Sequence, residues 1–221
     1  MSTLIVVGHY GSGKSEFAAN YALMERAKGK DVVVADVDIV NPYFRTRELQ
    51  DLFESRGIRI LSSNFRNEYN LDTPALNPGI QECFVPGDRL NIVDAGGDAA
   101  GAHVLARFSG GVREGEYEMW LTVNANRPMT DSCGKVRGQI GEIEAASGLR
   151  VTGLVNTTHM LRETGAADIM KGNRLAREVA GELHLPVVYN AVPAWVCGEL
   201  DAGALEGEIL PVELLLRQKW L

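Results

Sequence analysis

The sequence has few cysteines and no excess of basic residues, and each shortage excludes a class of protein. Its three cysteines, Cys83, Cys133 and Cys197, lie far apart and form no CxxC or CxC pair. A disulfide framework, a zinc site or an iron–sulfur site within one chain is therefore not expected, and a reducing cytoplasm is favoured. With 22 Lys and Arg residues against 29 Asp and Glu residues, the net charge is −7, which argues against nucleic acid as a partner.

Long hydrophobic runs are also missing. The first apolar run, residues 4–7, follows no basic segment and is far too short for a signal peptide or a membrane span. The tail, residues 210–221, has only two basic residues, Arg217 and Lys219, beside its apolar ones, which is too weakly cationic for a stable membrane anchor. We expect this tail to pack against the domain and the protein to be cytoplasmic.

What the sequence does contain is typical of a globular α/β protein. Hydrophobic residues make up 45% and charged residues 23%, and a length of 221 residues favours a single domain over residues 1–221. Apolar, β-branched segments alternate with segments of helical periodicity, which predicts a three-layer α/β fold. Its sheet should be mostly parallel, with about seven strands and helices on both faces. The predicted strands are residues 4–7, 31–35, 58–61, 90–93, 119–123, 151–155 and 186–189.

Helices are predicted between these strands. One should end at Gly29, a second should run from the Asn41-Pro42 pair to Gly57, and a third should cover about 164–183. The segment 62–89 breaks the alternation because it holds three prolines and only short apolar patches. It can hold an inserted region that binds a partner or a substrate.

The sharpest motif is a glycine-rich loop between the first strand and the first helix. It satisfies G-x-x-x-x-G-K-[ST] with the residues Gly8, His9, Tyr10, Gly11, Ser12, Gly13, Lys14 and Ser15. Glycines let successive backbone N–H groups surround phosphate oxygens at a helix N-terminus, the lysine ammonium binds the β and γ oxygens, and the hydroxyl can ligate Mg²⁺. The sequence therefore predicts a nucleoside triphosphate site.

Acidic residues at the ends of two further strands complete this prediction. Asp94 ends the strand at 90–93 and is followed by Gly97, whose backbone N–H can approach a γ-phosphate as in a switch segment. Asp36 and Asp38 follow the strand at 31–35, and strand alternation would direct them to opposite sides and to different roles.

This ordered set of motifs resembles the MinD and ParA group of P-loop ATPases, within the class that includes the signal recognition particle proteins, MinD and BioD. The N-terminal P-loop, D-x-D at Asp36, D-x-x-G at Asp94, Asn126-Arg127-Pro128, Asn156 and the Val192-Pro193 loop carry the resemblance over most of the chain. It implies that residues 8–16, including Glu16, and Gly97 bind the nucleotide. It further implies that Ser15, Asp36 and Asp94 serve Mg²⁺, that Asp38 positions the hydrolytic water, and that Asn156 and Pro193 hold the base.

Two departures from this family change the expectations. The MinD type has a signature lysine directly after the first P-loop glycine, where this chain has His9. The transfer of that lysine across a homodimer is therefore not expected, although dimerisation by other contacts remains open. The cysteine pair of the family's metallocluster carriers is absent as well.

The base is predicted from the residues after Asn156. Guanine recognition usually needs an Asp three positions later, and this chain has His159 there. A neutral imidazole cannot accept both guanine hydrogens, so ATP is the expected nucleotide. His159 itself is expected at the surface or at a helix cap, and His9, His103 and His184 are not assigned to a metal.

Three classes of function fit these residues. The first is a slow, Mg²⁺-dependent ATPase in which residues 96–101 act as a switch on a protein client or a second copy of the chain. The second is a small-molecule kinase or ligase whose acceptor is held by 62–89 and by Arg45 or Arg47, and the third is a module that binds ATP without hydrolysing it. Cys133, at the start of a predicted helix, could have a lowered pKa, although a buried and unreactive thiol is the expectation.

Overall fold

The computed structural model describes residues 2–38, 46–62 and 78–216. Within them, eight parallel strands form one sheet in the order β3-β2-β4-β1-β5-β6-β7-β8. Neighbours in this order that are far apart in sequence require crossover connections, which the helices supply. The strands are β1 (Thr3–Val7), β2 (Val32–Asp36), β3 (Arg59–Ser62), β4 (Leu90–Asp94), β5 (Tyr117–Val123), β6 (Gly153–Asn156), β7 (Val187–Pro193) and β8 (Glu208–Val212).

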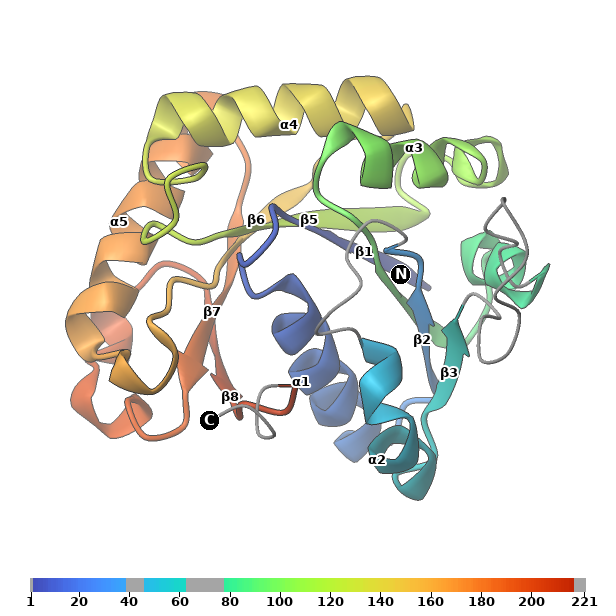
Figure 1. The fold of residues 1–221 in the computed structure, drawn as a ribbon, viewed down its shortest axis with the longest axis horizontal. Coiled ribbons are helices and arrows are strands. Elements are labelled where there is room, and N and C mark those ends of the chain that lie inside the picture. The colour runs from blue at the N-terminus through green and yellow to red at the C-terminus, as the bar shows by residue number, and fades with distance from the viewer. Residues whose placement is uncertain (1, 39–45, 63–77, 217–221) are drawn as a thin grey trace, which may run out of the picture.

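The five α-helices in the described part of the chain cover both faces of this sheet (Figure 1). Alternate residues of β1 show the division, because Leu4 and Val6 pack with the helices α1 and α2, whereas Ile5 and Val7 pack with α3, α4 and α5. The predicted three-layer α/β fold is confirmed. The helices are α1 (Lys14–Ala27), α2 (Gln50–Ser55), α3 (Ala99–Ala106), α4 (Cys133–Ser147) and α5 (Ala166–Leu183).

The eighth strand, β8, is the one the sequence did not predict. It lies at the edge of the sheet, where it pairs only with β7, and its residues alternate between exposed and buried positions. Glu208 and Pro211 interrupt its apolar pattern, and an edge strand tolerates both because one side of it needs no partner. The apolar runs that identify central strands are therefore missing here.

The structure describes only part of the predicted helix from Asn41 to Gly57 and of the segment 62–89. The predicted helix start at Asn41 and the residue Arg45 lie outside the described residues, as do residues 63–77 and the side chain of Arg47. After residues 39–45, a 3₁₀ turn at Thr46–Leu49 leads into α2. After residues 63–77, a second 3₁₀ segment at Pro78–Phe84 buries Ile80 and Phe84 in the core. Of the segment 62–89 that was predicted to hold an insertion, residues 63–77 lie outside the described part, and residues 78–84 pack into the domain.

The C-terminal tail packs against the domain as far as it is described. Leu216 is buried in the same hydrophobic cluster as α1, and Leu215 packs against that cluster. None of the helices formed by the described residues is long and apolar enough to cross a membrane. Residues 217–221, including the last two apolar residues of the tail, lie outside the described part.

Candidate functional site

The glycine-rich loop lies at the carboxyl end of β1, in the middle of the sheet. Gly11 and Gly13 have φ values of 74° and 93°, in the left-handed region that favours glycine. Gly8 is required for a different reason, since a Cβ there would lie 1.9 Å from Oγ1 of Thr122 on β5. The loop is closed by a hydrogen bond from the Ser12 N–H to the His9 carbonyl. The strand, loop and helix thus adopt the arrangement that the motif predicts.

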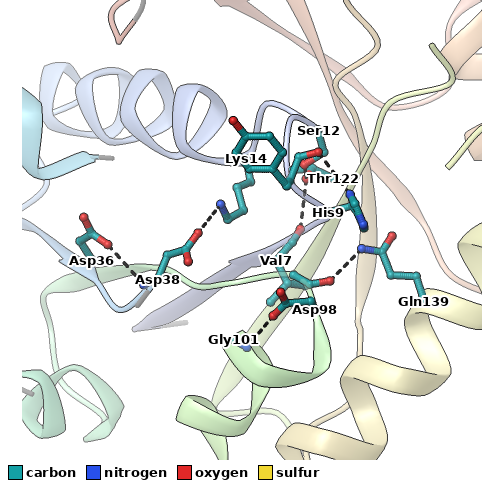
Figure 2. A network of polar contacts seen from close by, with 12 residues as sticks. Val7, His9, Ser12, Lys14, Asp36, Asp38, Asp98, Gly101, Thr122 and Gln139 are labelled. Carbon is teal, nitrogen blue, oxygen red and sulfur yellow. Dashed lines mark hydrogen bonds and ion pairs between the residues drawn. The ribbon is translucent and has the colours of Figure 1, made fainter. Parts of the chain in front are cut away.

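Lys14, the first residue of α1, is buried and turned toward an acidic partner. Its ammonium nitrogen lies 2.7 Å from Oδ2 of Asp38, and the two side chains are only 7% and 6% exposed (Figure 2). Burial acts to lower the pKa of Lys14, but the nearby carboxylates of Asp94, Asp38 and Asp36 raise it above its ordinary value. The lysine is therefore held in its charged form.

Asp94 and Asp36 lie side by side because β2 and β4 are parallel neighbours in which these two residues are register partners. Asp94 is fully buried, and neither of its carboxylate oxygens has a hydrogen-bond partner of good geometry among the described residues. Burial raises the pKa of Asp94 to about 7, against the opposing effect of Lys14. A buried carboxylate beside the hydroxyl of Ser15, without a full set of donors, is suited to a hard divalent cation such as Mg²⁺.

The predicted switch segment is packed directly on the P-loop. A Cβ on Gly97 would lie 1.9 Å from the carbonyl oxygen of Gly8. The two backbone segments are therefore too close together for any residue with a side chain at position 97. Gln139 on α4 donates from Nε2 to the Gly97 carbonyl at 3.0 Å, and Asp98 caps α3 by accepting from the Gly101 N–H (Figure 2). The contact of Gln139 with Gly97 was not predicted, because nothing in the local sequence of α4 indicates it.

A pocket opens beside the P-loop on the side of β6 to β8. His159, which was expected at the surface or at a cap, lies in this pocket and approaches the P-loop, since a Cβ on Gly13 would meet its Cε1 at 3.3 Å. Pro193, which the resemblance assigns to base binding, also lines this pocket. Besides these two, the lining includes Tyr10, Gly11, Gly13, Lys14, Ser15, Glu16, Phe17, Thr157, Leu161, Thr164, Ala191, Val212, Leu214 and Leu216.

Asn156, the second residue predicted to hold the base, is not among the residues that line this pocket. Its side chain is fully buried, and Nδ2 donates to the Ile169 carbonyl and to Oδ1 of Asn190, both at 3.0 Å. Its Oδ1 accepts from the Thr158 N–H at 3.1 Å. In this structure the Asn156 carboxamide therefore connects β6, β7 and α5, and the loop that follows it forms the pocket wall.

Two further side chains reach the P-loop region. Arg127, from the loop after β5, donates from Nε to the Gly11 carbonyl at 3.1 Å, although the sequence analysis gave it no individual role. Glu16 accepts hydrogen bonds from the backbone N–H groups of Leu215 and Leu216. The Glu16 carboxylate thus holds the C-terminal segment.

Cys133 begins α4 as predicted, but the hypothesis of a lowered pKa is wrong. Burial raises the pKa of this thiol, and a hydrogen bond to Glu182 together with the negative charge of Glu182 and Glu178 raises it further. These effects outweigh the helix N-terminus because they disfavour the thiolate directly.

Comparison with known proteins supports the fold. The sequence matches no protein-family model and no curated protein. Among solved structures, it is similar to the cell division protein FtsY of Thermotoga maritima (19% identity, TM-score 0.54, 86% of this chain and 61% of that chain). It is also similar to chloroplast FtsY of Physcomitrella patens (16%, 0.57, 86% and 58%) and to the 54 kDa signal recognition particle protein of Aeropyrum pernix, in complex with GDP (21%, 0.52, 81% and 39%).

These likenesses are at the level of the fold. The chain covers less than two thirds of the length of each of these proteins, at identities of 16 to 21%. They belong to the signal recognition particle branch of the class named above, and the resemblance to the MinD and ParA group is not confirmed by them. The chain has the α/β fold of a P-loop NTPase.

Proposed function

We propose that this protein binds a Mg²⁺-nucleoside triphosphate and hydrolyses it slowly, as a conformational switch that acts on a protein client or a second copy of the chain. The observation that carries this proposal is the P-loop with its buried, charged Lys14 next to the fully buried Asp94. A polyphosphate and its cation match these opposite charges. The Aeropyrum pernix protein, which has a similar fold, was solved in complex with GDP, and this supports a nucleotide as the ligand.

The roles of the residues follow from their positions. Backbone N–H groups of residues 11–15 would surround the phosphates, and Lys14 would bind their β and γ oxygens. Ser15, Asp94 and Asp36 would hold Mg²⁺ and its water ligands, and the ion would neutralise phosphate charge. To reach the phosphates, Lys14 has to leave Asp38, and this releases the Asp38 carboxylate to orient a water molecule.

We propose ATP as the nucleotide, with GTP as the alternative that the solved relatives suggest. ATP is favoured because His159 lies in the pocket where a guanine-specific site needs a carboxylate. No acidic residue other than Glu16 lines the described pocket, and the Glu16 carboxylate accepts backbone hydrogen bonds from the tail.

Communication to a partner would begin at Gly97. Its N–H can approach a γ-phosphate, while its carbonyl accepts from Gln139 on α4. A shift of this segment would therefore act on α3 and α4, which pack against each other. This is the route by which we expect hydrolysis to change a partner-binding surface.

The test is thermal unfolding with Mg²⁺ and ATP, Mg²⁺ and GTP, or Mg²⁺ alone, on the wild type, Lys14→Ala and the exposed-lysine control Lys135→Ala. A ligand at one hundred times its Kd should add about 2.7 kcal/mol, or roughly 5 to 10 °C in Tm. We expect this shift in the wild type and the control and its loss in Lys14→Ala, each compared with its own baseline. The absence of any shift with both nucleotides in the wild type would contradict the proposal.

A further inference from the structure

The C-terminal segment that follows β8 forms one wall of the pocket beside the P-loop. Val212 ends β8, and the pocket is lined by Val212, Leu214 and Leu216, whereas Leu215 is not among its lining residues. Val212 and Leu216 also belong to the core cluster that contains α1, whereas Leu215 is half-buried and packs against that cluster. The segment thus presents a continuous apolar row to the pocket.

Two side chains of α1 fasten this segment in place. Both backbone groups of Glu213 pair with the Asn20 carboxamide, with the N–H donating to Oδ1 at 2.9 Å and the carbonyl accepting from Nδ2 at 3.0 Å. One turn earlier on the same helix face, the Glu16 carboxylate accepts from the N–H groups of Leu215 and Leu216. Asn20 and Glu16 therefore substitute for a neighbouring strand, and Figure 1 shows β8 and the chain after it beside α1.

The anchoring helix is the helix that starts at the P-loop. Lys14, Ser15 and Glu16 all belong to its first turn. The apolar row is thus held at a fixed position relative to the phosphate-binding loop. The opposite side of the pocket comes from the loop after β6, with Leu161, and from β7, with Pro193. An apolar slot with walls on both sides, next to a phosphate site, suits a flat heteroaromatic ring.

We infer that Val212, Leu214 and Leu216 are part of a nucleobase subsite, in which Leu214 contacts the base and Asn20 and Glu16 hold the segment in place. This inference rests on the proposed function, since it requires a nucleoside triphosphate at the P-loop. The C-terminal segment would then contribute to the binding of the nucleoside and not to the binding of the phosphates. A ligand that has the phosphates alone, such as tripolyphosphate, separates these two contributions to the affinity.

The experiment compares the Kd of Mg²⁺-ATP and Mg²⁺-GTP with that of Mg²⁺-tripolyphosphate, measured by calorimetry on the full chain. The variants are Leu214→Ala, Asn20→Ala and the matched control Leu215→Ala, which changes the neighbouring side chain that faces away from the pocket. Leu214 and Leu215 are both half-buried, so both variants are expected to fold. Thermal unfolding without ligand checks this for each.

We expect Leu214→Ala to weaken binding of the preferred nucleotide about tenfold, with the Kd of tripolyphosphate unchanged. Asn20→Ala should produce a smaller selective loss, and Leu215→Ala should change neither Kd. Equal losses for nucleotide and tripolyphosphate, no loss in Leu214→Ala, or the same loss in Leu215→Ala would overturn the inference while leaving the proposed function intact. A wild type that binds neither ligand would overturn the proposed function and this inference together.

Discussion

Lys14 and Asp38 form a buried ion pair in which the ammonium nitrogen lies 2.7 Å from the carboxylate oxygen Oδ2. Lys14 is the P-loop lysine, and Asp38 follows the end of β2, two strands away from β1 in the sheet. The Asp38 carboxylate therefore contacts the same ammonium group that the phosphates would bind. At the proposed site, polyphosphate binding would compete with the Lys14–Asp38 contact, so removal of the Asp38 carboxylate should separate affinity from hydrolysis.

Asp38→Asn is expected to strengthen tripolyphosphate binding several-fold and to lower the rate of nucleotide hydrolysis. Affinity should rise because Lys14 no longer has to leave a carboxylate. Breaking a buried pair commonly costs 3–5 kcal/mol, and we expect about 2 kcal/mol in unliganded stability here because Asp94 and Asp36 still face the lysine. Calorimetry, phosphate release and chemical denaturation give the three values. Weaker tripolyphosphate binding in this variant would show that the two contacts do not compete.

Gly97→Ala is expected to disrupt the contact between the switch segment and the P-loop. Its new methyl group would lie 1.9 Å from the Gly8 carbonyl oxygen, and because that oxygen belongs to the backbone it cannot rotate away. We expect a loss of several kcal/mol in stability, or of nucleotide binding, in the range of severe core substitutions. Gly110→Ala is the matched control, because nothing lies within 4 Å of a Cβ at that position. Normal Tm and nucleotide affinity in Gly97→Ala would rule out this close packing.

Asn156→Ala should destabilise the protein by about 2–3 kcal/mol without bound ligand. The substitution would leave Oδ1 of Asn190, the Ile169 carbonyl and the Thr158 N–H without this partner in the protein interior. Denaturant titration of the unliganded variant measures the loss. If stability is unchanged and only nucleotide affinity falls, Asn156 holds the base, as the family resemblance implies, and has no structural role.

Gly138→Ala is expected to stabilise the protein by about 0.5–1 kcal/mol. Gly138 is an exposed position in the interior of α4, and nothing lies within 4 Å of a Cβ there. Glycine in such a position costs backbone entropy that alanine does not. Chemical denaturation compares the variant with the wild type, and a destabilised Gly138→Ala protein would mean that this face of α4 is in contact with something.

Glu25→Gln should reduce stability by about 1 kcal/mol at neutral pH and by less in acid. Burial acts to raise the pKa of Glu25, but hydrogen bonds and ion pairs with Lys28 and Lys30 lower it below its ordinary value of 4.5. A carboxyl group whose pKa is lower in the folded state stabilises the protein above its unfolded pKa, and this contribution is lost as the pH falls through the folded pKa. Both lysines are about half exposed, so solvent screens the pairs and the effect stays small.

Stability measured between pH 7 and pH 3 tests this sign. The difference between the wild type and Glu25→Gln should narrow below about pH 4.5, whereas the exposed-residue control Glu142→Gln should differ little from the wild type throughout. A difference that widens in acid would mean that the Glu25 carboxyl is destabilising when charged.

Much of the fold could be predicted because its signals are local. Central parallel strands are buried on both faces and are therefore mainly apolar, as β1, β2 and β4 are. The P-loop is fixed by glycines whose backbone geometry no other residue adopts easily. The family resemblance assigned Asp36 and Asp94 to the same ion, and the parallel register of β2 and β4 places these two residues side by side.

Contacts between distant parts of the chain could not be predicted in this way. Gln139 reaches Gly97 because α3 and α4 pack together, and Asn156 is turned into the interior by its partners on β7 and α5. The edge strand β8 has a mixed sequence because only one of its sides is paired.

Short-range spacing and the burial of central strands were enough to predict the P-loop, the acidic residues at the strand ends and the layered fold. The contact between Lys14 and Asp38, and the contacts by which Glu16 and Asn20 hold a segment 193 to 200 residues away, depend on the tertiary structure. Such pairs form because sheet order and helix packing bring separate segments together. The sequence around each of these residues does not indicate which distant residue it will contact.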